Sequence, residues 1–278
     1  MKPPAFTYHR PRSLEDTLDV LGSLGERGKV LAGGQSLVPL MSMRLSAPEE
    51  IVDVNHVPGL GGVVVETGVV RLGALARHSE VEHDEAAFAA IPLLRQALRH
   101  VAHPTIRNRG TTVGSLVHAD PAAEMPAVLM LLDGFVTLRS AAGTRDVAAA
   151  DFFTGPMESA TRAGELAVSA TFRRPPAGSG SSFVEVARRQ GDYAVCGVGA
   201  VVSGDRVLVA LVSVGDGPVL IDLSATYDGS VLDHDAARDL VDASIDPEGD
   251  IHASADYRRH LAHVLVARAV AEARTVAA

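Results

Sequence analysis

Two short glycine-containing segments hold the residues best suited to binding a ligand. The first runs from Ala32 to Ser36 and follows the apolar pair Val30-Leu31. Adjacent glycines allow positive φ and a close backbone approach, so consecutive N–H groups can point into one concavity and hold a phosphate. A helical turn after the segment would add anion attraction of roughly 0.3–1 kcal/mol, and Ser36 would add a donor. An ordinary strand-to-helix turn has the same pattern.

The second segment, Gly110 to Ser115, is rich in small and hydroxyl-bearing residues and follows Arg107-Asn108-Arg109. Two such loops, about eighty residues apart, could close on a single diphosphate from opposite sides. Neither contains Gly-x-Gly-x-x-Gly or Gly-x-x-x-x-Gly-Lys-Ser/Thr. The sequence therefore predicts neither a Rossmann fold nor a P-loop NTPase.

Acidic and aromatic residues beyond these loops have two interpretations each. Asp120 and Glu124 would share a helix face and could do acid–base work, although Asp120 before Pro121 could equally cap the helix. The polar segment Arg188–Ala194 lies between apolar runs. It is either a hairpin tip with a surface Tyr193 or a loop that brings Tyr193 onto a planar ligand.

Histidines and nucleophiles give weaker signals. His100, His103 and His118 lie close in sequence but lack a metal-binding pattern, so no metal site is predicted. We expect His100 and His103 at a solvated helix end, where a cation suits the dipole, and His118 beside the second segment. Cys196 lies in an apolar run, which predicts a buried, unreactive thiol. No Gly-x-Ser-x-Gly surrounds Ser36 or Ser115, and no catalytic side chain is predicted.

The composition is that of a folded protein. The chain has 278 residues, of which 47% are hydrophobic and 21% charged, with a formal charge of −9. This acidic balance argues against non-specific binding to nucleic acid or to anionic membranes. Neither a signal peptide nor a stretch of ~18 apolar residues is predicted. One cysteine can form no internal disulfide and hold no iron–sulfur cluster, so we expect a cytoplasmic protein.

Periodicity and turn signals predict mixed helix and strand, an α+β arrangement. A helix capped by Ser13 should run to Gly28, and a helical stretch from 79 to 103 should break at Pro92. A short helix is expected at 121–132, and a linker at 175–182. The remaining expectations are strands at 30–31, 51–54, 63–65, 69–72, 136–138, 167–172, 183–187, 197–202 and 207–214, and helices at 235–243 and 256–277.

The ordered set of motifs resembles the flavoprotein (medium) subunit of the molybdenum hydroxylases, the family that includes aerobic carbon monoxide dehydrogenase and xanthine dehydrogenase. Residues 32–39, Ala-Gly-Gly-Gln-Ser-Leu-Val-Pro, resemble the first FAD loop of that family, and residues 108–127 resemble the second. Flanking stretches agree in order and spacing, at residues 51–55, 72–75 and 191–194. The resemblance covers nearly the whole chain.

The resemblance implies a two-lobed FAD-binding domain of the vanillyl-alcohol-oxidase/PCMH type at 1–176, with lobes of about 1–55 and 56–176. A C-terminal domain with a small antiparallel sheet and helices would occupy 177–278. The two loops would hold the FAD pyrophosphate, Asp120 and Glu124 would bond ribityl or ribose hydroxyls, and Tyr193 would lie near the isoalloxazine ring. The expected cofactor-binding residues are Ala32, Gly33, Gly34, Gln35, Ser36, Leu37, Thr111, Thr112, Gly114, Ser115, Asp120, Glu124 and Tyr193.

Two positions depart from the family pattern. Val113 stands where the family usually has a glycine, and a β-branched residue disfavours positive φ and keeps the backbone farther from a phosphate. The loop would then take a different path, with Thr112 contributing, or hold FAD less tightly. Relatives often carry a Lys near Glu185, so a cationic contact from this strand is not expected here.

The family implies an electron-transfer role. The chain would take electrons from [2Fe–2S] clusters in a small partner subunit and pass them to an external acceptor, while a large subunit holds the molybdenum cofactor and acts on substrate. A dimer of heterotrimers is the family expectation, and carbon monoxide, an N-heterocycle and an aldehyde remain open as substrates. Two alternatives are a stand-alone FAD oxidase or dehydrogenase and a non-catalytic nucleotide-binding module.

Overall fold

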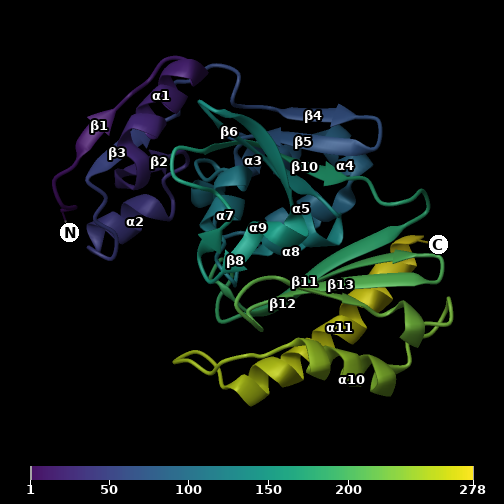
Figure 1. Ribbon diagram of the computed structural model, residues 1–278. Helices are drawn as coiled ribbons and strands as arrows, with labels where there is room; N and C mark the ends of the chain where they lie inside the picture. Colours follow the sequence, from purple (N-terminus) through teal and green to yellow (C-terminus); the bar gives the residue numbers. More distant parts are fainter. Residues whose placement is uncertain (1, 278) are drawn as a thin grey trace.

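The computed structural model describes residues 2–277, which form an N-terminal lobe, a central lobe and a C-terminal domain (Figure 1). No helix within these residues combines the length and the apolarity needed to cross a bilayer. The fold is the α+β type that the sequence predicts, and most expected strands and helices form within a few residues of their expected positions.

The N-terminal lobe is a three-stranded parallel sheet in the order β1-β3-β2, packed against one helix. Ser13 caps that helix as predicted, because its hydroxyl accepts a hydrogen bond from the Asp16 amide at 3.0 Å. The helix ends at Gly25, which takes φ +57°, and not at Gly28, which already belongs to a strand. The elements are β1 (Thr7–His9), α1 (Leu14–Leu24), the 3-10 turn Gly25–Arg27, β2 (Gly28–Leu31), α2 (Leu37–Ser42) and β3 (Glu50–Asp53).

The central lobe contains an antiparallel five-stranded sheet in the order β4-β5-β10-β6-β7. Its strands are β4 (Val63–Glu66), β5 (Val69–Gly73), β6 (Phe135–Ser140), β7 (Gly143–Ala148) and β10 (Leu166–Arg173), and a small hairpin joins β8 (Phe153–Gly155) to β9 (Glu158–Ser159). The helices are α3 (His78–His83), α4 (Glu85–Ala90), α5 (Pro92–Leu98), α6 (Pro104–Arg107), α7 (Thr112–His118), α8 (Glu124–Leu131) and α9 (Ala149–Phe152).

Two predicted helices of the central lobe have different bounds in the structure. The stretch from 79 to 103 breaks at Asp84 as well as at Pro92, because the Asp84 carboxylate accepts a hydrogen bond from Ala87 N at 2.7 Å and begins a new helix. The helix expected at 121–132 begins at Glu124, after a turn.

The C-terminal domain is an antiparallel sheet in the order β11-β12-β13-β14, with two helices on one face. The predicted linker is shorter than expected, because strand β11 begins inside it and only residues 174–179 are irregular. The elements are β11 (Gly180–Ala187), β12 (Ala194–Ser203), β13 (Arg206–Val212), β14 (Val219–Asp222), the 3-10 turn Ser224–Thr226, α10 (His234–Ser244) and α11 (Ala255–Ala277).

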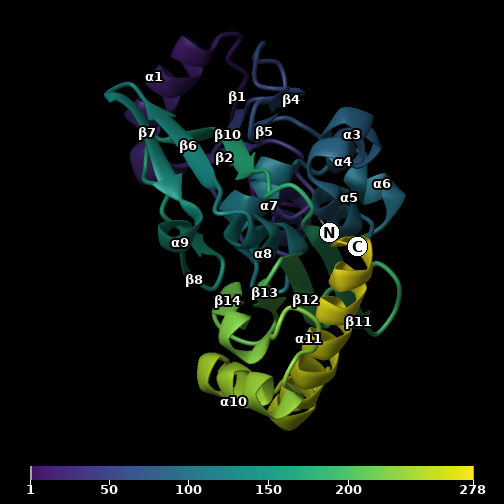
Figure 2. The same ribbon diagram turned by 90° about the vertical axis from the view of Figure 1, so that its right-hand side faces the viewer.

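The central lobe and the C-terminal domain form successive layers. Helices α5 and α8 lie between the five-stranded and four-stranded sheets, and α10 and α11 cover the far side of the second sheet (Figures 1 and 2). Buried side chains from both regions form a single cluster, which includes Leu129 of α8, Phe172 of β10 and Val212 of β13. These two parts therefore share a core, whereas the N-terminal lobe has a separate small cluster around Leu21 and Val52.

Candidate functional site

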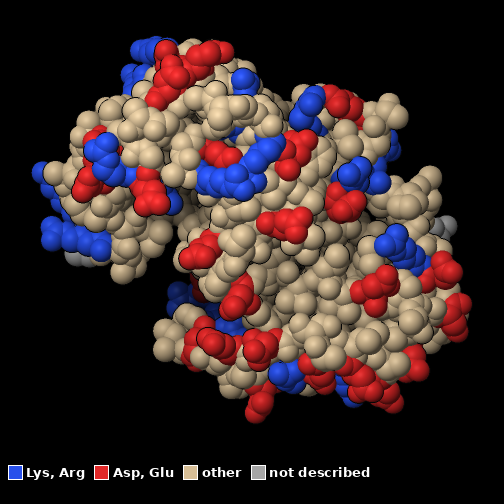
Figure 3. All heavy atoms as spheres, viewed as in Figure 1, with Lys and Arg blue, Asp and Glu red and all other residues tan. Residues whose placement is uncertain are grey.

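A cleft of about 510 Å³ lies where the three parts of the molecule meet. One wall comes from Ala32–Leu37 of the N-terminal lobe, and the opposite wall comes from the start of α7 and the turn before α8. Residues 191–193, at the tip of the β11–β12 hairpin, line it from the C-terminal domain. The space-filling view shows the molecule hollowed between the N-terminal lobe and the C-terminal domain (Figure 3).

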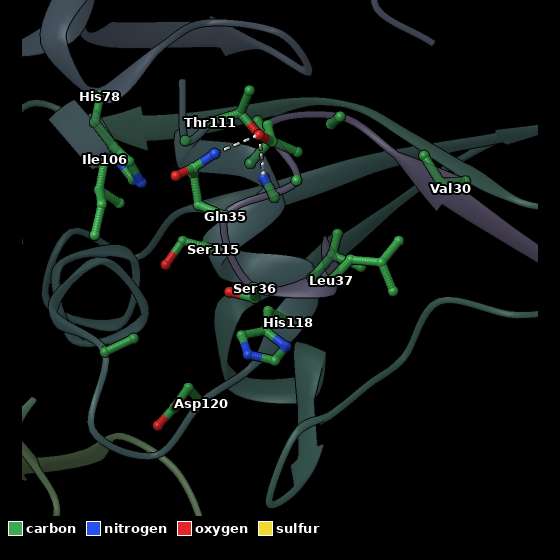
Figure 4. A pocket seen from close by; sticks show the side chains of 18 of the residues that line it. Val30, Gln35, Ser36, Leu37, His78, Ile106, Thr111, Ser115, His118 and Asp120 are labelled. Carbon is green, nitrogen blue, oxygen red and sulfur yellow. Dashed lines mark hydrogen bonds between the residues drawn. The ribbon is translucent and has the colours of Figure 1, made fainter. Parts of the chain in front are cut away.

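Every predicted cofactor-binding residue except Thr112 lines the cleft. Figure 4 labels six of them: Gln35, Ser36 and Leu37 from the first loop, Thr111 and Ser115 from the second, and Asp120. Thr112 is fully buried, and its hydroxyl lies 3.1 Å from Nδ1 of His78 instead of facing the cleft. Burial and then the charge of Arg107 lower the pKa of His78 to about 4, so this imidazole is neutral at physiological pH. The Thr112 side chain therefore does not line the cleft, and this geometry gives no support to its predicted contact with the cofactor. The residues that do line the cleft are Ala32, Gly33, Gly34, Gln35, Ser36, Leu37, Thr111, Gly114, Ser115, Asp120, Glu124 and Tyr193.

The first loop, Ala32–Ser36, follows β2 and touches the second loop backbone to backbone. A Cβ at Gly33 would lie 2.5 Å from the Arg109 carbonyl oxygen and 2.7 Å from the Gly110 Cα, so only glycine fits there. Gly34 takes φ +70°, and its carbonyl accepts a hydrogen bond from Val38 N as α2 begins. The close approach that adjacent glycines permit is thus used in this fold.

The second loop, Gly110–Ser115, is the capped start of α7. The Thr111 hydroxyl accepts a hydrogen bond from the Gly114 amide at 3.2 Å, and the loop is joined to the preceding strand region where Thr112 N donates to the Ala76 carbonyl. Val113 lies in the first helical turn, has no positive φ, and is only 2% exposed within the core. The expected conflict between a β-branched residue and the loop conformation therefore does not arise.

The turn between α7 and α8 carries the two predicted carboxylates. Ala119 adopts left-handed backbone with φ +52° and ends α7, so the chain turns back toward the cleft. Asp120 does not cap α8; its carboxylate accepts a hydrogen bond from Ala122 N at 2.9 Å, and the N-cap position is Ala123. Asp120 and Glu124 thus do not share a helix face, but both line the cleft.

Glu124 is buried at the start of α8 and holds a proton at neutral pH. It is 7% exposed, and burial followed by the nearby charge of Glu185 raises its pKa to about 8. One Glu185 oxygen lies 3.4 Å from Nδ1 of His100, and the other has no hydrogen-bond partner among the described residues. A protonated Glu124 can donate a hydrogen bond as well as accept one.

Tyr193 lies at the mouth of the cleft and keeps its proton. Its side chain is 64% exposed, but burial of the phenol end and then the charges of Asp120 and Glu124 raise its pKa to about 12. Gly191 at the hairpin tip packs against the His103 ring. Its φ is +85°, and a Cβ at this position would lie 2.5 Å from Cε1 of His103. Tyr193 therefore fits both of its interpretations, since it is an exposed residue of a hairpin tip and also lines the cleft.

His100 and His103 both lie next to helix ends: His100 follows the C-cap of α5, and the exposed His103 is the N-cap residue of α6, where a cation does not suit the helix dipole. α5 ends at Leu98, and His100 beyond it contacts Glu185 and the Phe183 ring. His118 lines the cleft as predicted, and burial, with a smaller effect from Lys29, lowers its pKa. Within residues 2–277, no group of three or more His, Cys, Asp or Glu side chains is arranged to hold a metal ion.

Cys196 is fully buried in β12, and burial raises the pKa of its thiol to about 12. This placement confirms the expectation of a buried thiol. A thiol that stays protonated is a poor nucleophile and a poor metal ligand.

Several residues that line the cleft were not among those selected from the sequence. Lys29, His78, Met157 and Glu165 line it from four different elements or loops. Lys29 could have been found from its place in the strand that leads into the first loop. The others carry no local signal, because they reach the cleft only through tertiary packing.

Two family models match the chain. Residues 4–172 match the FAD binding domain in molybdopterin dehydrogenase, and residues 181–273 match the CO dehydrogenase flavoprotein C-terminal domain. The chain belongs to the FAD-binding medium subunits of the molybdenum hydroxylases. This membership confirms the family, fold class and FAD cofactor that the motifs indicate, and identifies the chain as a subunit of a molybdenum-containing oxidoreductase.

Two curated relatives and one solved structure illustrate matches over nearly the full length of both chains. The chain is 38% identical to the nicotine 6-hydroxylase medium subunit of Paenarthrobacter nicotinovorans, over 98% of this chain and 99% of that protein. It is 34% identical to the carbon monoxide dehydrogenase medium chain of Afipia carboxidovorans, over 99% of this chain and 98% of that protein. The cyanide-inactivated Cu,Mo-CO dehydrogenase superposes with a TM-score of 0.93 at 33% identity, covering 99% of this chain and 100% of that chain.

The lining of the cleft fits FAD. Its volume lies within the roughly 300–1,000 Å³ typical of cofactor sites. Backbone groups of two glycine-containing loops and the hydroxyls of Ser36, Thr111 and Ser115 supply neutral polar contacts suited to a diphosphate. Tyr193 supplies an exposed aromatic face at the mouth, where a planar ring can pack.

Proposed function

We propose that the cleft holds FAD with its diphosphate between the first and second loops and its isoalloxazine ring toward Tyr193. The single observation that carries this proposal is the backbone contact at Gly33, which brings the two loops together as two walls of one site. When bound, FAD supplies redox chemistry that accepts and releases electrons singly or in pairs. The chain's residues bind and orient it.

Each wall has a distinct part in the proposal. Ala32–Leu37 bind the diphosphate from one side, and Thr111, Gly114 and Ser115 bind it from the other. Asp120 and the protonated Glu124 bond ribityl or ribose hydroxyls, and Tyr193 covers the ring. Thr112 acts only through His78, which it holds beneath the second loop.

The role we propose is electron transfer from a [2Fe–2S] partner subunit to an external acceptor. Cys196 is the sole cysteine of the chain and is buried, so clusters must reside in another subunit. A large subunit with the molybdenum cofactor and a small iron–sulfur subunit complete the complex, as a dimer of heterotrimers in the cytoplasm. Relatives named for nicotine and for carbon monoxide match the chain to similar extents, and substrate contacts belong to the large subunit.

A visible absorption spectrum tests this function. The full chain is purified by itself and again after co-expression with its genomic neighbours, and released cofactor and co-purifying chains are identified by mass. We expect flavin bands and FAD in the preparation, with iron–sulfur absorption and molybdenum only when larger partners are present. A colourless protein without partners in both preparations would overturn the proposal.

A further inference from the structure

We propose that Asn55 and Arg77 form a clamp that positions the first loop against the second, and so controls FAD affinity without touching FAD. Neither residue lines the cleft. The proposal rests on the proposed FAD site, and its test separates failure of the clamp from failure of that site.

Asn55 holds the first loop through its side-chain amide. Its Nδ2 donates to the Ala32 carbonyl at 2.8 Å and also to Oδ1 of Asp53 at 2.7 Å. Its Oδ1 accepts from a guanidinium nitrogen of Arg77 at 2.6 Å. Every polar atom of this amide is therefore engaged, which leaves it a single orientation.

Arg77 holds the second loop with the other arm of its guanidinium. That arm donates to the Arg109 carbonyl at 2.5 Å, and the Arg77 backbone pairs with Thr111. The Arg109 oxygen is the same atom that closes against Gly33. The planar Arg77 guanidinium thus bonds both Asn55 and the Arg109 carbonyl. Because Asn55 in turn bonds Ala32, the two loops are linked at the point where they touch.

The buried Asp53 carboxylate orients the Asn55 side chain. Asp53 ends β3 and accepts hydrogen bonds from the Tyr8 hydroxyl at 2.5 Å and from the Asn55 amides. Burial alone would raise the pKa of Asp53, but these hydrogen bonds lower it below its usual range, so the group stays ionised. The ionised Asp53 carboxylate accepts a hydrogen bond from Nδ2 of Asn55, so Oδ1 of Asn55 points toward Arg77 and accepts from its guanidinium.

An asparagine and an arginine are both needed, because each supplies hydrogen-bonding groups that its nearest analogue lacks. An aspartate at position 55 would keep the acceptor for Arg77 but lose the donor to Ala32. A lysine at position 77 would keep the charge but could not span both partners with a planar fork. Asn55→Asp therefore removes the donor bonds of the amide to Ala32 and to the Asp53 carboxylate, and sets a second carboxylate beside Asp53. Arg77→Lys removes one arm of the fork, and both substitutions leave nearly the same volume.

The test compares Asn55→Asp, Arg77→Lys and the double variant with wild type, using the full chain in its purified complex after removal of FAD. Binding of FAD and of ADP, which carries the diphosphate without a flavin, is titrated, and circular dichroism of the bound flavin is recorded. Arg71→Lys serves as the control, because Arg71 is an exposed arginine paired with Glu66 outside the cleft.

We expect each single variant to lose about 10- to 100-fold in affinity for both FAD and ADP, the range that a lost charge-assisted hydrogen bond supports. The double variant should lose less than the product of the two, because both residues act on the same contact. The flavin dichroism should change in every clamp variant and not in Arg71→Lys.

Three results overturn the clamp and are distinct from failure of the FAD site. Wild-type affinity in both single variants would show that the loops need no clamp. Fully multiplicative losses would show that the residues act separately. A lowered unfolding midpoint with unchanged affinity and flavin dichroism in the folded protein would show a purely structural role. Only absence of FAD and ADP binding by wild type would refute the proposed site itself.

Discussion

The first and second loops face one another across the cleft but are held in different ways. The second loop is the capped beginning of α7, and Val113 and Thr112 anchor it in the large core shared with the C-terminal domain. The first loop has no regular structure, and its position depends on Gly33 and on the side chain of Asn55. The second-loop wall of the cleft is thus anchored in the large core, whereas the first-loop wall is placed by a few specific contacts.

Because the two loops are held differently, we expect substitutions around one to change FAD affinity and substitutions beneath the other to change the free energy of unfolding. Changes in the first loop should displace a wall that belongs to a small lobe with its own small core. Changes beneath the second loop should reduce the free energy of unfolding of the larger part, because they disturb buried groups. The following substitutions test that separation.

Gly33→Ala should have the largest effect. The new Cβ would lie 2.5 Å from a backbone oxygen, so the loops must move apart. A displacement of about 1 Å at a positioned site can cost on the order of 100-fold, and we expect FAD affinity to fall at least that far. FAD titration measures the effect. Gly61→Ala is the matched control, because its Cβ would meet no atom within 4 Å. Wild-type affinity in Gly33→Ala would contradict the loop contact.

Glu124 lies on the second-loop wall of the cleft, and Glu124→Gln should change how the free energy of unfolding depends on pH. The pKa of Glu124 is about 8 in the folded protein against an ordinary value of 4.5, so its protonated form stabilises the fold below about pH 4.5. That contribution is lost as pH rises toward 8. The stability of Glu124→Gln relative to wild type should therefore increase between these limits, by on the order of a few kcal/mol.

Denaturant unfolding at pH 5 and pH 8.5 measures the Glu124 effect. The exposed Glu158→Gln should show no such pH-dependent difference from wild type. A flat difference for Glu124→Gln as well would show that Glu124 is ionised in the folded state.

Thr112→Val should lower stability with little change in FAD affinity. The substitution keeps the shape but leaves the buried His78 nitrogen without its partner, which costs about 1–3 kcal/mol. Thermal unfolding and FAD titration of the same preparation separate the two effects. Thr105→Val, at an exposed threonine, is the control. A large loss of FAD affinity with unchanged stability would reverse the assignment of Thr112.

Tyr193→Phe should have the smallest effect. The side chain is 64% exposed, so stability should change by no more than about 0.5 kcal/mol. The aromatic ring remains, so visible circular dichroism of bound FAD should stay near that of wild type, whereas Tyr193→Ala should alter it. Identical spectra for both variants would show that Tyr193 does not cover the flavin.

Much of the fold could be predicted because its signals are local. Ser13 caps α1, and most alternating or continuous apolar runs form strands where expected. Errors arose where a second local signal competed. Asp84 begins a new helix within a stretch that periodicity alone makes continuous, and Gly25 ends α1 before Gly28. Short elements such as α9 and the β8–β9 hairpin carry too few residues to show a period.

The cleft residues could be selected because glycine pairs and hydroxyl-rich turns stand out in sequence and resemble a known family. The sequence does not show how the side chains of these residues are oriented relative to one another. Thr112 has the same local pattern as Thr111, yet one hydroxyl faces His78 and the other caps α7. Only the packing of α7 on the core decides which of the two lines the cleft.

The sequence by itself determined the α+β class, the two loops and the family, because short-range sterics and hydrophobic periodicity act between residues close in the chain. The tertiary structure decided which atoms meet. Ala32, Asn55, Arg77 and Arg109 come from separate segments, and they form one hydrogen-bonded path only after the lobes pack. The raised pKa of Glu124 has the same origin, since burial and a charge on β11 create it.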